Sequence, residues 1–241
     1  MNITINGFLY KFIDKRKVFY YTTFMIISFV STKGGQGKST LSLCVSYSKT
    51  FNKSFDSIGL VEMDVQGTLR TWYVCRGENE GRIENDKVSY SELIGKNDEA
   101  IKSTLNETIK RNEVVILDVG GTGRPTKYLQ MALKLSDVVI IPQRTSIPDE
   151  FSFYDNLVPT IKDVIQEYPK KRKGVFHLLP TFVNPTSNPK KVISHFRDVI
   201  PEYIDILPCC FYQRKVFEDC MFDGNTLIEN LEYSKTNKRE N

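Results

Sequence analysis

The most constraining feature of this sequence is a glycine-rich loop between an apolar run and an apparent helix. The loop reads Lys33-Gly34-Gly35-Gln36-Gly37-Lys38-Ser39-Thr40. The run Met25–Ser31 precedes it, and apolar residues follow it at mostly helical spacing. Such a loop can present several backbone N–H groups to one anion, with the positive end of the helix dipole behind them. The order of strand, loop and helix therefore predicts a phosphate-binding site, and the alternative is an ordinary glycine turn.

The loop also matches most of the nucleotide-binding pattern G-x-x-x-x-G-K-[ST]. Lys38 is expected to contact the β and γ phosphates, and the hydroxyl of Ser39 is expected to bind Mg²⁺. The match is incomplete because Thr32 occupies the position of the first glycine, and Lys33 is an additional lysine. We therefore expect nucleotide phosphate binding by a loop that departs from the usual pattern.

The rest of the chain alternates apolar runs with helical patterns. The further predicted strands are Ile58–Asp64, Val114–Asp118, Asp137–Pro142 and Gly174–Val183. The clearest predicted helices are Ser91–Arg111, Lys127–Leu135, Asp149–Glu167 and Pro189–Asp198. Continuous apolar strands alternating with helices are typical of a parallel sheet that is covered on both faces. We predict an α/β fold with a mostly parallel twisted sheet and helices on both faces.

Composition excludes several classes of protein. The chain has 241 residues, of which 40% are hydrophobic, so it can form a full core and is not largely disordered. Five cysteines, widely spaced apart from one adjacent pair and without a Cys-x-x-Cys motif, fit neither a disulfide framework nor a zinc or iron–sulfur site, and they favour a reducing cytosol. The net charge of +4 is too small to identify a polyanionic partner, so the distribution of the charges matters more.

The two ends of the chain differ from the body. Residues 1–24 include the basic run at 15–17, which is followed by the uncharged run Val18–Thr32. This layout is that of a signal peptide, but the run is too short for a membrane helix and its second half is needed as a strand. Residues 1–24 are therefore treated as an extension of uncertain status: Met25 as the true start, an added strand and a loose basic arm all stay open. Residues 233–241 are expected to form a polar tail.

The loop resembles the deviant Walker A box, K-G-G-x-G-K-[ST], of the ParA/MinD family of P-loop ATPases. Val61–Gly67 is similar to the family's D-x-D-P-Q-G box, with Glu62 in place of the first Asp and Val65 in place of Pro, and Glu113–Asp118 is similar to its Walker B strand. Three later segments resemble the following strand, the adenine-side strand end, and the closing strand, loop and helix: Ser136–Pro142, Phe182–Asn184 and Leu207–Gly224. The resemblance implies a single-domain P-loop NTPase over residues 25–232.

The resemblance also implies roles for individual residues, with ATP and Mg²⁺ as ligands. Ser39, Asp64 and Asp118 are expected to hold Mg²⁺, and Asp64 is also expected to position or activate the attacking water. Lys33 is expected to reach the phosphates of a partner subunit in an ATP-bound homodimer. The whole loop from Lys33 to Thr40, with Asn184 and Arg214, would contact the nucleotide. The plainer interpretations are helix caps for the two aspartates and a solvated loop lysine for Lys33.

One departure from the family concerns the segment after the Walker B strand. The family usually has Thr or Cys followed by Pro-Pro, whereas this chain has Val119-Gly120-Gly121-Thr122-Gly123. The glycines predict a more mobile switch, and the usual hydroxyl contact is missing unless Thr122 supplies it. This departure bears on the rate of hydrolysis more than on binding.

A basic stretch follows the predicted nucleotide site. Between Glu167 and Asp198 there is no acidic residue. The basic residues in between are Lys170, Lys171, Arg172, Lys173, Lys190, Lys191 and Arg197. Such a patch could bind DNA phosphates without reading sequence, with a steep dependence on salt, and the alternative is a solvated basic face. Arg214 and Lys215 could extend the patch, unless Arg214 serves the nucleotide.

These observations lead to an expected function and two alternatives. We expect a cytoplasmic, nucleoid-associated ATPase that partitions a plasmid or chromosome, dimerises on ATP, binds nonspecific DNA and is stimulated by a ParB-type partner. The polar C-terminal residues have no apolar face, so membrane docking is not expected. The alternatives are a nucleotide-gated positioning or assembly ATPase for a protein cargo without DNA, and a biosynthetic enzyme similar to dethiobiotin synthetase.

Overall fold

A computed structural model describes residues 24–77, 86–121, 126–168 and 175–230. The expectations for residues 1–23, for Thr122 and Gly123, for Lys170–Lys173 and for the tail at 233–241 lie outside these residues.

A single sheet organises the described residues, in the strand order β3-β2-β4-β1-β5-β6-β7, with β8 beside β6. Every pair is parallel, which confirms the predicted α/β class and makes the sheet entirely, not mostly, parallel over the described residues. The strands are β1 (Met25–Val30), β2 (Ile58–Met63), β3 (Val88–Glu92), β4 (Val114–Val119), β5 (Val138–Gln143), β6 (Phe176–Val183), β7 (Ile204–Ile206) and β8 (Phe211–Tyr212).

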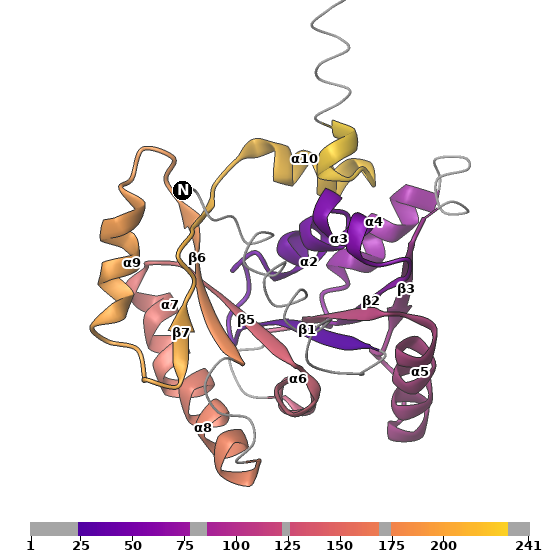
Figure 1. Cartoon of the computed structure of the whole chain (residues 1–241), viewed down its shortest axis with the longest axis horizontal. Helices are drawn as coiled ribbons and strands as arrows, with labels where there is room; N and C mark the ends of the chain where they lie inside the picture. The colour runs from indigo at the N-terminus through magenta and orange to yellow at the C-terminus, as the bar shows by residue number, and fades with distance from the viewer. Residues whose placement is uncertain (1–23, 78–85, 122–125, 169–174, 231–241) are drawn as a thin grey trace, which may run out of the picture.

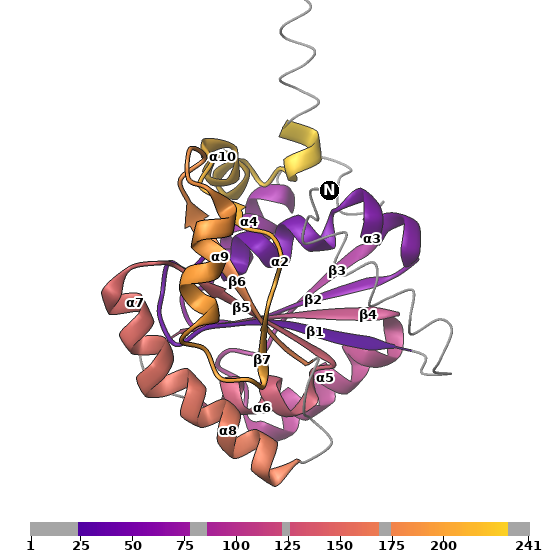
Figure 2. The same ribbon diagram turned by 60° about the vertical axis from the view of Figure 1, so that its left-hand side comes forward.

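Helices cover both faces of this twisted sheet, as Figures 1 and 2 show. One face carries α2 (Lys38–Ser46), α3 (Lys49–Ser54), α4 (Thr68–Gly77) and α10 (Lys215–Asp223). The other carries α5 (Asp98–Arg111), α6 (Lys127–Leu135), the π-helical turn η1 (Phe153–Leu157), α8 (Val158–Glu167) and α9 (Pro189–Arg197). The short helix α7 (Ile147–Ser152) leads into η1. No helix of the described residues is both long enough and apolar enough to span a membrane.

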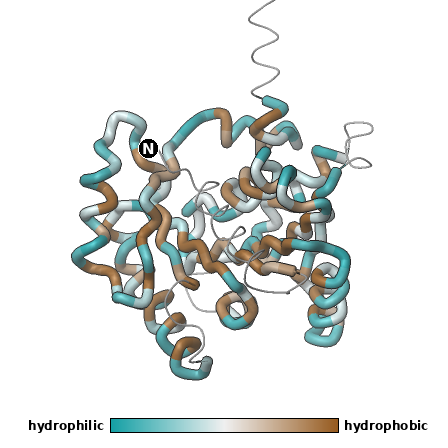
Figure 3. Tube along the Cα trace, in the orientation of Figure 1, coloured by the Kyte–Doolittle hydropathy of each residue, from teal (hydrophilic) through white to brown (hydrophobic). Residues whose placement is uncertain are grey.

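The central strands β1, β2, β4, β5 and β6 are largely apolar because both faces of the sheet are covered. In β1, Ile27 and Phe29 pack into the cluster under α2, whereas Ile26 and Val30 pack into the cluster on the opposite face. This alternation follows from the two-residue period of a strand. Figure 3 shows the hydrophobic segments gathered in the central strands, with hydrophilic residues on the outer turns of the helices.

One predicted helix is wrong over its first turns. The stretch Ser91–Arg111 was expected to be helical, but its first residues belong to β3, and α5 begins only at Asp98, where the side chain of Asn97 accepts a hydrogen bond from the backbone of Ala100. β3 is an edge strand that is buried only at Val88, so its sequence is polar and lacks the continuous apolar signal of the central strands. The closing strand was expected from Leu207, whereas β7 ends at Ile206.

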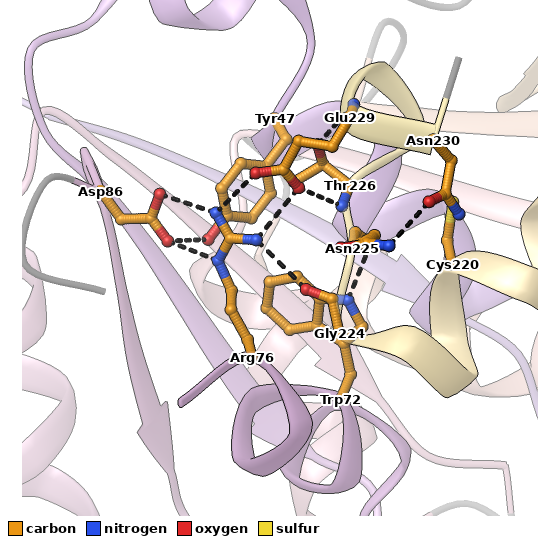
Figure 4. Close-up of polar contacts among 10 residues, drawn as sticks. All are labelled: Tyr47, Trp72, Arg76, Asp86, Cys220, Gly224, Asn225, Thr226, Glu229 and Asn230. Carbon is orange, nitrogen blue, oxygen red and sulfur yellow. Dashed lines mark hydrogen bonds and ion pairs between the residues drawn. The ribbon is translucent and has the colours of Figure 1, made fainter. Parts of the chain in front are cut away.

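A buried arginine fastens the C-terminal part of the described chain to α4, as Figure 4 shows. The guanidinium of Arg76 donates to Asp86 at 2.7 and 3.0 Å, to Glu229 at 3.1 and 3.3 Å, and to the carbonyl of Gly224 at 3.1 Å. A buried charge is stable only when its polar atoms are satisfied, and these contacts satisfy this one. The cluster thereby fixes the C-terminal end of α10 against α4.

Candidate functional site

The glycine-rich loop connects β1 to α2 at the carboxyl end of the sheet. Gly35 has a φ of 72° and Gly37 a φ of 89°, in the left-handed region that favours glycine. Gly37 is the N-cap of α2, and the buried Lys38 is the first residue of that helix. The backbone therefore has the shape of an anion-binding loop at a helix N-terminus, as the sequence predicts.

Asp118 of β4 is the most unusual side chain near this loop. It is fully buried, and neither carboxylate oxygen has a hydrogen-bond partner of good geometry among the described residues. Burial raises the pKa of Asp118 to about 7, although Lys38 and Ser39 oppose the rise. A buried carboxylate without donors is costly unless a cation faces it. The residue thus fits the predicted magnesium site better than it fits a helix cap, because a cap would show a hydrogen bond.

Asp64 lies beside Asp118 at the same edge of the sheet. It follows β2, whose Glu62 is in register with Asp118, and its Oδ1 accepts the backbone N–H of Gln66 at 3.0 Å. No group of three or more His, Cys, Asp or Glu side chains in the described part of the chain could hold a metal. Two carboxylates and the Ser39 hydroxyl fit Mg²⁺ nonetheless, because this ion usually binds one or two carboxylates and keeps waters and phosphate oxygens as its other ligands.

Glu62 occupies the position of the family's first acidic residue but has a structural function. Its carboxylate accepts the backbone N–H groups of Leu69 and Arg70 at 3.0 and 2.8 Å and the hydroxyl of Tyr90 at 2.8 Å. Burial raises the pKa of Glu62, and these hydrogen bonds oppose the rise. The longer glutamate therefore caps the start of α4.

Lys33 forms an ion pair within its own chain. Its Nζ lies 2.6 Å from Oδ1 of Asp149 in α7; the Lys33 side chain is 42% exposed and that of Asp149 is 7% exposed. The hydroxyl of Ser146 also contacts Asp149. Burial alone would raise the pKa of Asp149, but Lys33 and Ser146 hold it below its usual value. Lys33 is therefore not a free, solvated loop lysine in this state, and Asp149 is a site residue that the sequence reasoning missed.

Two more loop residues contact the segment between β5 and α7. The hydroxyl of Thr32 lies 3.0 Å from the carbonyl and 2.9 Å from the hydroxyl of Ser152, and Oε1 of Gln36 accepts the backbone N–H of Arg144 at 2.9 Å. Thr32 therefore gains a hydrogen bond at the position where the usual pattern has glycine. The segment 144–152 forms a second wall beside the glycine loop.

The glycines after β4 are explained by close packing. A Cβ at Gly120 would lie 2.6 Å from Cγ of Asp64, and a Cβ at Gly121 would lie 2.7 Å from backbone atoms of Lys33. Any larger residue would displace one of these groups. The structure thus gives a packing reason for the two glycines, in addition to the mobility that the sequence predicts. Thr122 lies outside the described residues.

A cavity of about 190 Å³ adjoins the start of α2. Its walls include Thr40, Phe182, Phe211, Tyr212, Arg214 and Phe217. Aromatic walls of this kind suit a flat, partly apolar group. Arg214 lines this cavity, and its contact with a nucleotide stays a prediction. Asn184 is not among the described residues that line the cavity, and its Oδ1 accepts hydrogen bonds from the backbone and hydroxyl of Thr186 at 3.0 and 2.8 Å.

The predicted basic patch is described only in part. Lys190, Lys191 and Arg197 are exposed on α9, and none of them forms an ion pair with another described residue. Nε2 of His195 on the same helix lies 2.7 Å from Oε1 of Glu150 in α7. Lys171, Arg172 and Lys173 lie outside the described residues, so the structure supports an exposed basic helix face and no more.

Comparison of the sequence with protein-family models and with curated proteins finds no match. Comparison of the structure finds a protein of Borrelia burgdorferi B31 assigned to plasmid partition and bound to AMPPNP: 15% identity, TM-score 0.57, covering 90% of this chain and 100% of that chain. A ParA family ATPase from Chlorobium tepidum TLS has 11% identity and a TM-score of 0.56 and covers 85% and 92%, respectively. MinD of Aquifex aeolicus, in its complex with MinC, has 13% identity and a TM-score of 0.58 and covers 86% and 89%.

Each of these alignments covers 85% or more of this chain and 89% or more of the other chain. The sequence identities are low, so the likeness concerns the fold. The motif resemblance and the structural likeness, which are separate observations, point to the same group. The chain has the fold of the ParA/MinD P-loop ATPases.

Proposed function

We propose that this chain is an ATPase that dimerises on binding ATP, binds DNA in that state and partitions a plasmid or chromosome. The observation that carries the nucleotide part is the fully buried, unpartnered carboxylate of Asp118 beside Lys38 and the glycine loop. These groups fit a magnesium-bound phosphate chain. The similar protein of Borrelia burgdorferi is bound to AMPPNP, which supports the same ligand class here.

The proposed chemistry is ATP hydrolysis to ADP and phosphate. The loop N–H groups and Lys38 bind the phosphates. Ser39, Asp64 and Asp118 would hold Mg²⁺, which when bound would supply positive charge next to the phosphates. Asp64 positions the attacking water. Since phosphoryl transfer depends mainly on positioning and electrostatic stabilisation, this small set of groups is sufficient for slow turnover.

Dimerisation and partner control form the next part of the proposal. Lys33 leaves Asp149 and binds the phosphates of the partner subunit, so that ATP joins two copies of the chain. A ParB-type protein bound to the cargo then stimulates hydrolysis and separates them. The exposed lysines and arginine of α9, with Lys171, Arg172 and Lys173, bind DNA phosphates nonspecifically and keep the dimer on the nucleoid.

Helix α7 supports nucleotide control of the basic helix. Its consecutive residues Asp149 and Glu150 contact Lys33 of the glycine loop and His195 of α9, at 2.6 and 2.7 Å. A change in the partner of Lys33 therefore acts on the same helix turn that contacts α9. This short connection is a physical route from the phosphate site to the proposed DNA-binding face.

DNA retention on a filter, with AMPPNP, with ADP and without nucleotide, tests the proposal. Retention is expected only with AMPPNP, is expected to fall steeply with salt, and is expected to be lost in Lys33→Ala and Lys38→Ala. Lys110→Ala, which removes an exposed lysine of α5, is the matched control and is expected to behave as wild type. DNA retention that is indifferent to nucleotide would contradict the switch.

A second function is favoured by a separate observation. Ile147 and Phe151 on α7 are 72% and 63% exposed, beside the Lys33 contact. Such an apolar pair suits a protein partner, as in a nucleotide-gated positioning ATPase with a protein cargo and no DNA. Nucleotide-dependent dimers that never retain DNA would favour this function, and turnover that requires a small metabolite would favour a biosynthetic enzyme.

A further inference from the structure

Phe182, at the end of β6, has a backbone conformation that its residue type rarely adopts. Its φ is 52°, and among the described residues it is the one non-glycine with a positive φ. The pairing of β6 with β8 shifts register between Thr181 and Val183, on either side of it. Strained residues of this kind persist where the surroundings hold them, and they cluster at functional sites. The conformation of Phe182 therefore requires a reason.

The strained backbone brings the Phe182 ring against the glycine loop. A Cβ at Gly37 would lie 3.1 Å from Cε2 of this ring, which is tighter than ordinary van der Waals contact. The ring also lines the cavity that adjoins Thr40. The Phe182 ring thus lies between Gly37 and the cavity.

The ring carries a positively charged group on its face. Cζ of Arg144, in the segment after β5, lies 4.4 Å from the centroid of the Phe182 ring. The Arg144 backbone is also fixed: its N–H donates to Gln36 at 2.9 Å and its carbonyl accepts from Nε2 of Gln143 at 2.9 Å. Both the backbone and the guanidinium of Arg144 are therefore held beside the glycine loop.

No acidic side chain neutralises this guanidinium among the described residues. The two carboxylates of the adjacent helix α7 have other partners, since Asp149 binds Lys33 and Glu150 binds His195. An aromatic ring holds a guanidinium through its face while leaving the five N–H donors at the edge of the group available. The arrangement keeps the charge of Arg144 available to an anion.

We propose that Arg144 is a nucleotide-binding residue, held by Phe182 so that its planar guanidinium contacts the phosphates of the ATP bound by its own chain. This inference rests on the proposed nucleotide site. Guanidinium binds phosphate oxygens through two parallel hydrogen bonds, which a lysine cannot reproduce. Phe182 acts as a positioning residue, and its unusual backbone is what sets the ring between Gly37 and Arg144.

Titration calorimetry with magnesium-AMPPNP tests the proposal on the full chain. Arg144→Gln is expected to weaken binding about tenfold or more, because it removes a charge-assisted contact to phosphate. Arg144→Lys is expected to fall between Arg144→Gln and wild type, and Phe182→Leu is expected to weaken binding because it releases the guanidinium. Arg111→Gln removes an equal charge from the exposed end of α5 and is the matched control, with an affinity equal to wild type.

The outcomes separate this proposal from the proposed function. If wild type does not bind AMPPNP, the proposed function itself fails. If wild type binds, Lys38→Ala does not, and Arg144→Gln binds as wild type does, then the role of Arg144 is wrong while the nucleotide site stands. The series is repeated in a Lys33→Ala background, which is expected to stay monomeric. If Arg144→Gln weakens AMPPNP binding in the wild-type background but not in the Lys33→Ala background, Arg144 contacts the nucleotide of the partner subunit. That result would overturn the proposal.

Loss of folding is controlled separately. Arg144 is half-buried and bonds the loop through its backbone, which Gln and Lys retain, so the thermal midpoints of these variants without nucleotide are expected to equal that of wild type. The difference is expected to appear only as a smaller increase in the thermal midpoint when AMPPNP is added. Equal increases in wild type and Arg144→Gln would contradict the proposal.

Discussion

At the scale of single residues, the site combines groups that destabilise the ligand-free protein. Asp118 is the clearest example, because burial disfavours its charged form and the nearby Lys38 and Ser39 only partly offset this cost. A raised pKa in the folded state means that the charged side chain weakens folding at pH values above the ordinary carboxyl pKa, and that the cost reaches its full size above pH of about 7. Such a cost is tolerated at sites where a ligand later supplies the missing partner.

Asp118→Asn is expected to stabilise the ligand-free protein. The neutral amide removes the buried charge, so the free energy of unfolding at pH 8 in EDTA is expected to rise by about 1–3 kcal/mol, and the gain is expected to shrink as the pH falls toward 5. The same variant is expected to lose stabilisation by magnesium-AMPPNP. Urea unfolding at the two pH values measures the first effect, and a lower stability at pH 8 than that of wild type would contradict it.

Gly121→Ala is expected to damage the site from outside the glycine loop. Its Cβ would lie 2.7 Å from backbone atoms of Lys33, which cannot move as a flexible side chain does. We expect weaker AMPPNP binding together with a slightly lower thermal midpoint, since overpacking costs about 1–3 kcal/mol. Circular dichroism checks that the variant folds. Unchanged AMPPNP affinity in the folded variant would contradict the prediction, because it would show that the segment after β4 shifts to accommodate the added methyl group.

At the scale of helices and strands, the sequence predicts the central part of the sheet and misses its edges. β1, β2, β4, β5 and β6 are apolar because both faces are covered, so their signal is strong. β3 is half exposed and polar, and its strand character comes from pairing with β2, a tertiary contact that local sequence does not report. Helix α4 is also missed by the sequence prediction. The backbone N–H of Arg70 in its first turn donates to Glu62, which lies eight residues earlier in β2 and is no ordinary capping position.

The same distinction applies to the site. Lys33, Lys38 and Asp118 are predicted because each belongs to a motif at fixed spacing in the chain. Asp149 and Arg144 are missed because they act through contacts with residues more than 100 positions away, on a segment that carries no motif. A weak signal was present for Asp149: an acidic residue soon after the carboxyl end of a strand that lies next to β1.

Arg76→Met tests the cluster that fixes the end of α10 to α4. Removing the guanidinium leaves the carboxylates of Asp86 and Glu229 without their partner, and breaking a buried pair costs about 3–5 kcal/mol. Because Glu229 is partly exposed, with a side-chain exposure of 34%, we expect a loss of about 2–3 kcal/mol in urea unfolding. Arg70→Met breaks the exposed pair with Glu92 and is expected to cost less than about 1 kcal/mol. Equal losses in the two variants would contradict a structural role for the cluster.

At the scale of the whole molecule, Lys33 has two competing partners. In the single chain it binds Asp149, whereas the proposed dimer requires it at the phosphates of the other subunit. The two arrangements exclude each other, so the ion pair with Asp149 opposes dimerisation by its own free energy. The Lys33 side chain is 42% exposed, whereas that of Asp149 is 7% exposed. Because water reaches the lysine and screens its charge, we expect this ion pair to contribute about 1 kcal/mol or less. The ion pair therefore favours the single chain over the dimer by a small free energy, which a substitution at Asp149 can remove.

Asp149→Asn is expected to shift this balance toward the dimer. The amide keeps an oxygen for the Ser146 hydroxyl but loses the charge that holds Lys33, and each dimer gains the effect twice. With saturating magnesium-AMPPNP, the dimer dissociation constant in sedimentation velocity is expected to fall by about three- to tenfold. Asp155→Asn, an exposed charge on η1, is the matched control and is expected to leave the constant unchanged. Without nucleotide both variants are expected to stay monomeric, because only the phosphates give Lys33 a new partner. A weaker dimer in Asp149→Asn would instead show that Asp149 orients Lys33 toward the other subunit, and the ion pair would then assist assembly.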